Sequence, residues 1–173
     1  WLNVIGKMLQ DLPRIEEFCK VIHNSGYEHL VLLGMGGSSM TAMAFQKAFS
    51  DSTTMAMKLT VLDTVEPQTI KKTDAEINIE KTLFIVSSKS RTTAEVLALY
   101  EYFSNRMKIV KKDNWAENFI AITDQGSALE TIAIDNSFRK VFVNFSEIGG
   151  RYSAISYFGI VPEALMGITI KEI

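Results

Sequence analysis

Val31-Leu32-Leu33-Gly34-Met35-Gly36-Gly37-Ser38-Ser39-Met40 is the stretch on which the fold of this chain depends. Residues 29–33 form a short, mostly apolar run, which predicts a buried strand that ends at a glycine. The glycines that follow let the backbone turn sharply and approach a ligand closely, because no Cβ stands in the way. We expect Ser38 or Ser39 to cap the helix that continues through Ala48. A strand, a glycine turn and a helix N-terminus together predict an anion site, although a tight connection without a ligand has the same pattern.

A dinucleotide is one ligand that such a turn could bind. The dinucleotide fingerprint requires a third glycine where this chain has Ser39. Asp63 does close the next apolar strand, as a ribose-binding acid would. The match is therefore partial, and it is weak evidence alone.

A second motif favours a phosphorylated small molecule instead. Ser87-Ser88-Lys89-Ser90-Arg91-Thr92-Thr93 follows another buried-strand run and places five hydroxyls and two cations just before a helical pattern. Hydroxyls and backbone N–H groups donate directional hydrogen bonds to a charged oxygen, each contributing about 1.5–3 kcal/mol. The alternative is that these residues only cap the helix that begins near Thr92 or Thr93, but one residue would suffice for capping. The sequence favours a phosphosugar ligand.

Three ordered motifs resemble the sugar isomerase (SIS) domain of phosphoglucose isomerase: Gly34-Met35-Gly36-Gly37-Ser38, the hydroxyl motif from Ser88 to Thr93, and Gly149-Gly150-Arg151-Tyr152-Ser153. The resemblance is closer to the isomerase portion of bacterial transaldolase/glucose-6-phosphate isomerase fusion proteins, which have a similar sequence at Ala121-Ile122-Thr123-Asp124. One departure is Arg91, where those relatives usually have glycine or phenylalanine.

The resemblance assigns roles to individual residues of the site. It implies that Arg151 stabilises the negative charge of an enediolate and that Gly36 and Gly150 contact the substrate. No residue of the chain fits the catalytic base, which those enzymes carry in a second SIS domain, and Glu147 is interpreted as a loop carboxylate. We expect neither a cofactor nor a metal. The residues implied to bind the substrate phosphate are Gly37, Ser38, Ser88, Lys89, Ser90 and Thr93.

Strands alternate with helices along the chain and predict an α/β fold. We expect a three-layer α/β/α sandwich with a five-stranded parallel sheet, flavodoxin- or Rossmann-like, as in SIS domains. A single domain over 1–173 would comprise an N-terminal helical segment (1–26), the sheet with its crossover helices (27–150) and an apolar helical segment (151–173). The last segment is apolar on nearly every side, so we expect it to expose a patch that packs on a missing second domain or a second subunit. The strands are expected at residues 29–33, 57–62, 82–86, 118–122 and 140–145.

Composition excludes several classes of protein. A net charge of −2 over 173 residues argues against a nucleic-acid binder that relies on phosphate neutralisation. The single Cys19 excludes an internal disulfide and suits a reducing cytoplasm, where we expect the protein to be. The longest uncharged stretch is broken by the glycine–serine turn, so no membrane span is expected. The chain begins at Trp1, which leads us to expect a piece of something longer.

Two functions are compatible with these observations. The first is the N-terminal SIS domain of a glucose-6-phosphate isomerase, which would bind a hexose phosphate, would need a missing C-terminal isomerase half and is expected to form a homo-oligomer. The second is a non-catalytic SIS module that senses sugar phosphates. The arginine motif favours the isomerase, because a module that only binds phosphosugars would not need a charge stabiliser at Arg151.

Overall fold

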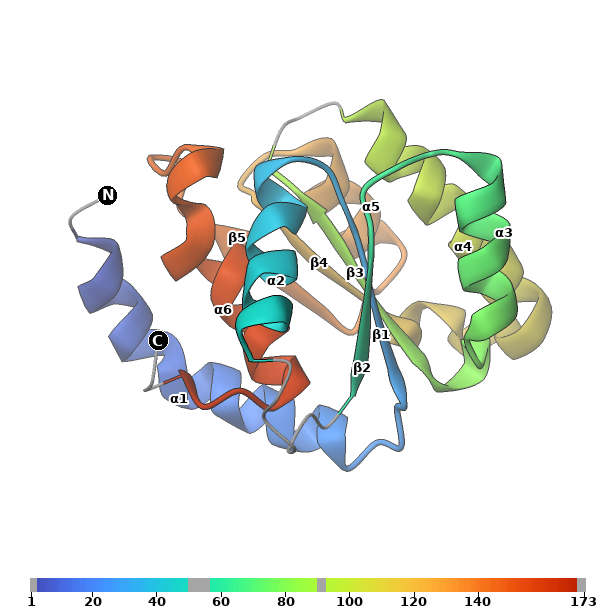
Figure 1. Ribbon diagram of the computed structural model, residues 1–173, viewed down its shortest axis with the longest axis horizontal. Helices are drawn as coiled ribbons and strands as arrows, with labels where there is room; N and C mark the ends of the chain where they lie inside the picture. The colour runs from blue at the N-terminus through green and yellow to red at the C-terminus, as the bar shows by residue number, and fades with distance from the viewer. Residues whose placement is uncertain (1–2, 50–56, 90–92, 171–173) are drawn as a thin grey trace.

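A computed structural model of the chain describes residues 3–49, 57–89 and 93–170, and it describes only the backbone of Gly150 and Arg151. Its five strands form one parallel sheet in the order β2-β1-β3-β4-β5 (Figure 1). This confirms the predicted five-stranded parallel sheet. The strands are β1 (His29–Gly34), β2 (Lys58–Leu62), β3 (Thr82–Ser88), β4 (Phe119–Asp124) and β5 (Lys140–Asn144).

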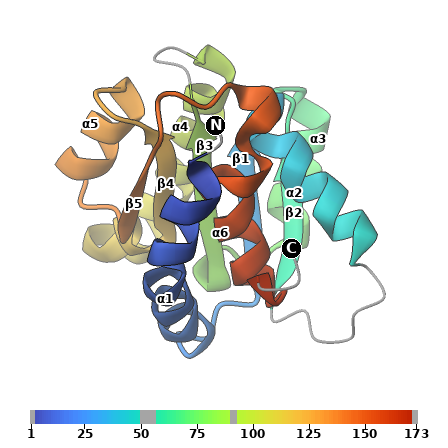
Figure 2. The same ribbon diagram turned by 90° about the vertical axis from the view of Figure 1, so that its left-hand side faces the viewer.

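Helices cover both faces of the sheet, as Figures 1 and 2 show, so the predicted three-layer sandwich is confirmed. One face is covered by α1 (Val4–His23), α2 (Gly37–Ala48) and α6 (Tyr157–Met166), and the other by α3 (Pro67–Glu76), α4 (Ala94–Lys111) and α5 (Ala128–Asp135). Three short 3-10 helices lie between these elements: η1 (Ile79–Lys81), η2 (Lys112–Asn118) and η3 (Gly150–Ile155).

The sheet separates two hydrophobic cores, one on each of its faces. In β1, Leu30 and Leu32 pack toward α1 and α6, whereas Val31 and Leu33 pack toward α4. All seven residues of β3 are buried. A strand that is buried on both faces has a near-continuous apolar run, here residues 83–86 of β3, and this explains why the strands could be located from the sequence.

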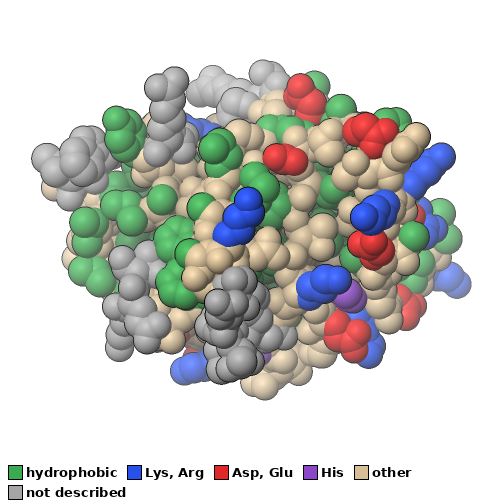
Figure 3. All heavy atoms as spheres, viewed as in Figure 1, with side chains coloured by type: hydrophobic (Ala, Val, Ile, Leu, Met, Phe, Trp, Pro, Cys, Tyr) green, Lys and Arg blue, Asp and Glu red, His purple; other side chains and the backbone are tan. Residues whose placement is uncertain are grey.

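Helix α1 has one buried stripe, which runs from Val4 through Ile15 to Ile22 and packs against α6. Burial raises the pKa of the Cys19 thiol on this stripe to about 12, so the thiol is inert at neutral pH. Ile5 and Leu9 lie beside the stripe and are exposed. Figure 3 shows apolar side chains gathered at the end of the molecule where α1 begins, and charged side chains of both signs interspersed on the opposite side of the view.

The apolar segment near the C-terminus differs from our expectation. We predicted that its helix would leave an apolar patch exposed, but all ten residues of α6 are buried within this chain. The outer face of α6 is covered by α1, α2 and η3. Figure 2 shows that α6 lies on the sheet between α1 and α2. The prediction of an exposed patch on α6 is therefore wrong. The proposed boundaries 1–26, 27–150 and 151–173 stay predictions.

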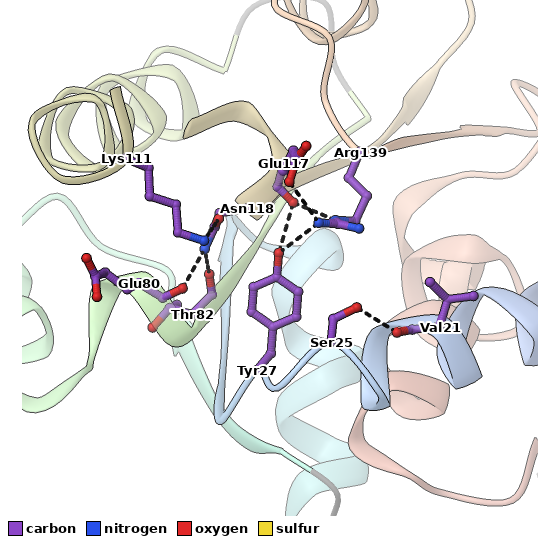
Figure 4. Close-up of polar contacts among 9 residues, drawn as sticks. All are labelled: Val21, Ser25, Tyr27, Glu80, Thr82, Lys111, Glu117, Asn118 and Arg139. Atoms are coloured by element: carbon purple, nitrogen blue, oxygen red, sulfur yellow. Dashed lines mark hydrogen bonds and ion pairs between the residues drawn. The ribbon is translucent and has the colours of Figure 1, made fainter. Parts of the chain in front are cut away.

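The N-terminal ends of the strands are held by two polar groups of contacts (Figure 4). Asn118 is fully buried; its amide donates to the carbonyl oxygens of Glu80 at 3.2 Å and Thr82 at 2.7 Å and accepts from Lys111 Nζ at 2.8 Å. These bonds join η1, β3, η2 and the end of α4.

The second group centres on Tyr27, whose hydroxyl donates to the Glu117 carbonyl oxygen at 3.1 Å. The Arg139 guanidinium donates to the same carbonyl oxygen at 2.6 Å and to the Tyr27 hydroxyl at 3.2 Å (Figure 4). The contacts join the segments that lead into β1, β4 and β5. Both groups lie at the edge opposite the loops described below, so we assign them to stability.

Asn118→Ala should lower the free energy of unfolding by about 2 kcal/mol, because two buried carbonyl oxygens lose their donor. Urea denaturation of the wild-type chain and the variant measures this difference. Asn105→Ala, at an exposed position of α4, is the matched control and should change stability little. An equal effect of the two substitutions would contradict the structural role of Asn118.

Candidate functional site

The three sequence motifs follow β1, β3 and β5, at the carboxyl end of one parallel sheet. The strand order runs in opposite directions from β1 to β2 and from β3 to β5, so the sheet changes direction between β1 and β3. Ligands of open α/β sheets bind in the crevice at such a switch point. The glycine turn and the hydroxyl motif flank this point, which supports the site predicted from the sequence.

Gly36, rather than a serine, begins the helix after β1. Gly36 is the N-cap of α2 and has φ +58°, a conformation that favours glycine, and Ser38 and Ser39 lie in the first turn. The Ser39 hydroxyl donates back to the Gly36 carbonyl oxygen at 3.0 Å. The expectation that Ser38 or Ser39 caps this helix is therefore wrong. The N-terminus of α2 nevertheless lies where an anion site was predicted.

The start of α2 packs closely on β1 and β3. A Cβ on Gly34 would lie 3.2 Å from the carbonyl oxygens of both Ser38 and Ser87, so a side chain there would crowd the backbone. The Ser87 hydroxyl donates to the Ser38 carbonyl oxygen at 3.2 Å. These contacts fix the glycine turn directly beside the end of β3.

The hydroxyl motif after β3 is partly described. Ser88 is buried, and its hydroxyl donates to the Thr93 hydroxyl at 3.2 Å. Thr93 is the N-cap residue of α4, yet among the described residues its side chain makes no capping hydrogen bond to that helix. That the motif binds a ligand, rather than only capping α4, stays a prediction. Ser90, Arg91 and Thr92 lie outside the described residues.

The side chain of Lys89 points across the sheet. Its ammonium donates to Asp124 Oδ2 at 2.9 Å and to the Ser146 carbonyl oxygen at 3.3 Å. Its side chain is 26% exposed. The sequence did not indicate these partners, because they follow from the neighbouring positions of β3, β4 and β5.

The loop after β5 leads into η3, which carries Gly150 and Arg151. The Ser153 hydroxyl donates to the Gly37 carbonyl oxygen at 3.4 Å, so η3 lies next to the start of α2. The side chain of Arg151 is not described, and its role stays a prediction. Glu147 is exposed and forms an ion pair with Lys7 at 3.5 Å, which fits its interpretation as a loop carboxylate.

The described residues bring hydroxyls and the N-termini of two helices to this edge of the sheet, and none of the described residues is an evident base for proton transfer. His29 begins β1 at the opposite edge of the sheet, and His23 contacts the Leu165 carbonyl oxygen at the end of α6. Asp124 lies at the edge of the sheet that carries the three motifs, but it is paired with Lys89. Within the described ranges, no three side chains of His, Cys, Asp or Glu are placed to hold a metal ion, and no helix is long and apolar enough to span a membrane.

The fold and its loops define the class of doubly wound α/β domains, whose ligands bind at the switch point of the sheet. A sequence profile of the family described as "Phosphoglucose isomerase" matches residues 3–170. The chain belongs to the phosphoglucose isomerase family.

Individual proteins agree with this assignment. The chain is 32% identical to glucose-6-phosphate isomerase of Campylobacter jejuni, over 94% of this chain and 40% of that protein. The crystal structure of a hypothetical protein from Thermus thermophilus superposes with a TM-score of 0.89 and 30% identity, covering 98% of this chain and 40% of that one. The crystal structure of a glucose-6-phosphate isomerase from Chlamydia trachomatis superposes with a TM-score of 0.81 and 31% identity, covering 93% of this chain and 30% of that one.

The chain spans about 40% of the length of the curated relatives it matches. The sugar isomerase domain of an RpiR transcription factor from Sphaerobacter thermophilus has the same fold, with a TM-score of 0.56 and 20% identity over 96% of this chain and 84% of that one. That similarity bears on the fold alone, and it shows that the SIS fold occurs in this chain.

Proposed function

We propose that this chain is the sugar-phosphate-binding part of a glucose-6-phosphate isomerase, which interconverts glucose 6-phosphate and fructose 6-phosphate through an enediolate. The observation that carries the proposal is the Ser88–Thr93 hydroxyl pair at the N-terminus of α4, beside the glycine turn. Backbone N–H groups at a helix N-terminus and adjacent hydroxyls are suited to a phosphate group. Membership of the phosphoglucose isomerase family supports the same ligand.

The proposed roles are those that the resemblance to phosphoglucose isomerase implies. Ser38, Ser88, Ser90 and Thr93 would bind the phosphate, with the backbone of Gly37 and Lys89. Gly36 and Gly150 would contact the sugar.

Arg151 would stabilise the enediolate, because a guanidinium stays protonated and offers fixed donors to a developing oxyanion. The proton-transferring base would come from outside this chain, in the missing isomerase half. A homo-oligomer, a cytoplasmic location and fusion to a transaldolase stay predictions from the sequence.

A regulatory module that only senses sugar phosphates is the second candidate, and the SIS fold of the RpiR transcription factor is the observation that favours it. A coupled isomerase assay on the longest natural form of the protein distinguishes the two. Turnover supports the isomerase. Tight binding of glucose 6-phosphate without turnover supports the module.

The phosphate site is tested by replacing Ser88 and Thr93 together with alanine. The double variant should bind glucose 6-phosphate about 30- to 150-fold more weakly, because charge-assisted bonds worth about 2–3 kcal/mol are lost. Isothermal titration calorimetry measures the affinity. Ser25→Ala with Thr131→Ala, which removes two exposed hydroxyls just after α1 and in α5, is the control and should leave the affinity unchanged. Undiminished affinity in the Ser88/Thr93 variant would show that these hydroxyls do not bind the phosphate.

A further inference from the structure

Asp124, the last residue of β4, forms the least exposed ion pair at the loop edge among the described residues. Its Oδ2 lies 2.9 Å from Lys89 Nζ, and the two side chains are 17% and 26% exposed. Exposed ion pairs contribute little, about 0–1 kcal/mol, because water screens them. The screening is weaker for this pair, so it can hold its two strand ends in a fixed relation.

The Lys89 ammonium also reaches the loop that follows β5. It donates to the Ser146 carbonyl oxygen at 3.3 Å, four residues before η3 begins at Gly150. One ammonium therefore joins three parts of the edge: the phosphate loop after β3, the end of β4 and the loop that leads to Arg151. The ion pair between Glu147 of this loop and Lys7 is exposed and longer, at 3.5 Å.

The second oxygen of Asp124 is buried and has no hydrogen-bond partner among the described residues. Asn144, its partner in the register of β5, is 4% exposed, and its Oδ1 is likewise buried and unpartnered there. Unpaired buried acceptors each cost about 1–3 kcal/mol. An apolar pair of similar volume would avoid this cost and often stabilises a fold. The sheet itself therefore has no need for a carboxylate at position 124.

We infer that Asp124 is a positioning residue, which holds the Lys89 ammonium against the Ser146 carbonyl oxygen. This contact would keep the loop after β3 (the phosphate loop) and the loop after β5 (the Arg151 loop) at a fixed separation, so that both can bind one ligand. This inference rests on the proposed function. It differs from a direct role of Lys89, in which the ammonium itself would contact the phosphate. Asp124 touches neither the phosphate nor the sugar in this arrangement and acts only through Lys89.

Two probes separate positioning from direct contact. Inorganic phosphate can occupy only the phosphate loop, whereas 6-phosphogluconate carries a phosphate at one end and a carboxylate at the other and can span both loops. Loss of the Asp124–Lys89 ion pair should weaken binding only of the ligand that spans both loops, because the loop that binds its second end is then no longer held in place. If Lys89 instead contacted the phosphate, freeing its ammonium from Asp124 would strengthen binding of both probes.

The experiment measures both affinities by calorimetry for the wild-type chain, Asp124→Asn, Lys89→Met and the double variant. Asp124→Asn should weaken 6-phosphogluconate binding about tenfold, within the usual range of coupling between two sites, and leave phosphate binding within about twofold. The losses of 6-phosphogluconate affinity in the two single variants should not add in the double variant, because each substitution removes the same ion pair. Lys72→Met removes an equal charge from an exposed position of α3 and should change neither affinity. Lys89→Arg, which keeps a donor, should retain most of the affinity for 6-phosphogluconate.

Phosphate binding in the same samples reports that the phosphate loop is folded, so the ratio of the two affinities is independent of any partial unfolding. Faster amide hydrogen exchange at residues 145–149 in Asp124→Asn is the second expected result. Equal loss of both probes, tighter binding of both or unchanged binding of both would overturn the positioning role while leaving the proposed function in place. Failure of the wild-type chain to bind either probe would overturn the proposed function and this inference together.

Discussion

Replacing Gly159 by alanine is expected to lower the free energy of unfolding by about 3 kcal/mol or more, because α6 has no room for a side chain there. A Cβ at this position would lie 1.9 Å from the Ala154 carbonyl oxygen in η3. A backbone oxygen cannot rotate away, so η3 and α6 would have to separate. For a chain of this length, the loss corresponds to a fall of about 6–12 °C in the melting temperature.

Gly6→Ala in α1 is a matched control for this substitution. A Cβ on Gly6 would meet nothing within 4 Å, and alanine is the better helix former by about 1 kcal/mol, so this variant should be more stable. Calorimetric melting of the two variants beside the wild-type chain measures the contrast. If Gly159→Ala melted at the wild-type temperature, the close packing of η3 on α6 would be wrong.

Replacing Glu163 by methionine is expected to raise the free energy of unfolding by about 1–3 kcal/mol, because it removes a buried polar group without partners, and the gain is expected to grow as the pH rises above 4.5. Glu163 is fully buried in α6, and neither carboxylate oxygen has a hydrogen-bond partner among the described residues. Burial raises the pKa of this carboxyl well above 4.5. Above pH 4.5 the folded chain therefore holds this proton more firmly than the unfolded chain does.

The cost of keeping that proton grows with pH. It increases between the unfolded pKa of 4.5 and the higher folded pKa, with a limiting slope of about 1.4 kcal/mol per pH unit. Stability of the wild-type chain should fall as pH rises through this window and level off above the folded pKa. Methionine has a similar volume and no charge, so it removes this decline.

Urea denaturation from pH 4 to pH 9 tests this prediction. The gain from Glu163→Met should be small at pH 4 and should grow steadily as the pH rises. Glu76→Met, at an exposed position of α3, should show no such pH dependence. A constant difference between Glu163→Met and wild type across the pH range would mean that Glu163 ionises alike in the folded and unfolded chains.

The sheet and several caps could be predicted because their causes are local. Each strand contains a short apolar run, and α3 and α5 begin next to residues that commonly start helices, with Pro67 at the first position of α3 and Ser127 as the N-cap of α5. The Glu66 carboxylate accepts from the backbone N–H of Gln68 at 3.0 Å, and the Ser127 hydroxyl accepts from that of Glu130 at 3.0 Å. Residues within three or four positions determine such features, so spacing reveals them.

Features that depend on distant segments could not be predicted in this way. The burial of α6 requires α1 and α2 to lie beside it, and the apolar pattern of α6 gives no sign of what covers it. The bond between Lys89 and Asp124 joins residues 35 positions apart and depends on the order of β3 and β4 in the sheet. The cap at Gly36 was missed for a different reason, since serine is the commoner cap and only the positive φ identifies the glycine.

The neighbouring positions of α1 and α6 on one face also determine the order of folding. Tyr157 donates to the Asp11 carboxylate at 2.8 Å across 146 residues, so this face of the sheet closes only when both ends of the described chain are present. Contacts of such sequence separation form slowly, whereas α4 and α5 cover the other face soon after their adjacent strands emerge from the ribosome. During synthesis, the part of this sheet face that α6 covers therefore stays exposed until α6 is made. A ribosome that pauses before residue 157 would hold an aggregation-prone chain, and chaperones are expected to bind it at that stage.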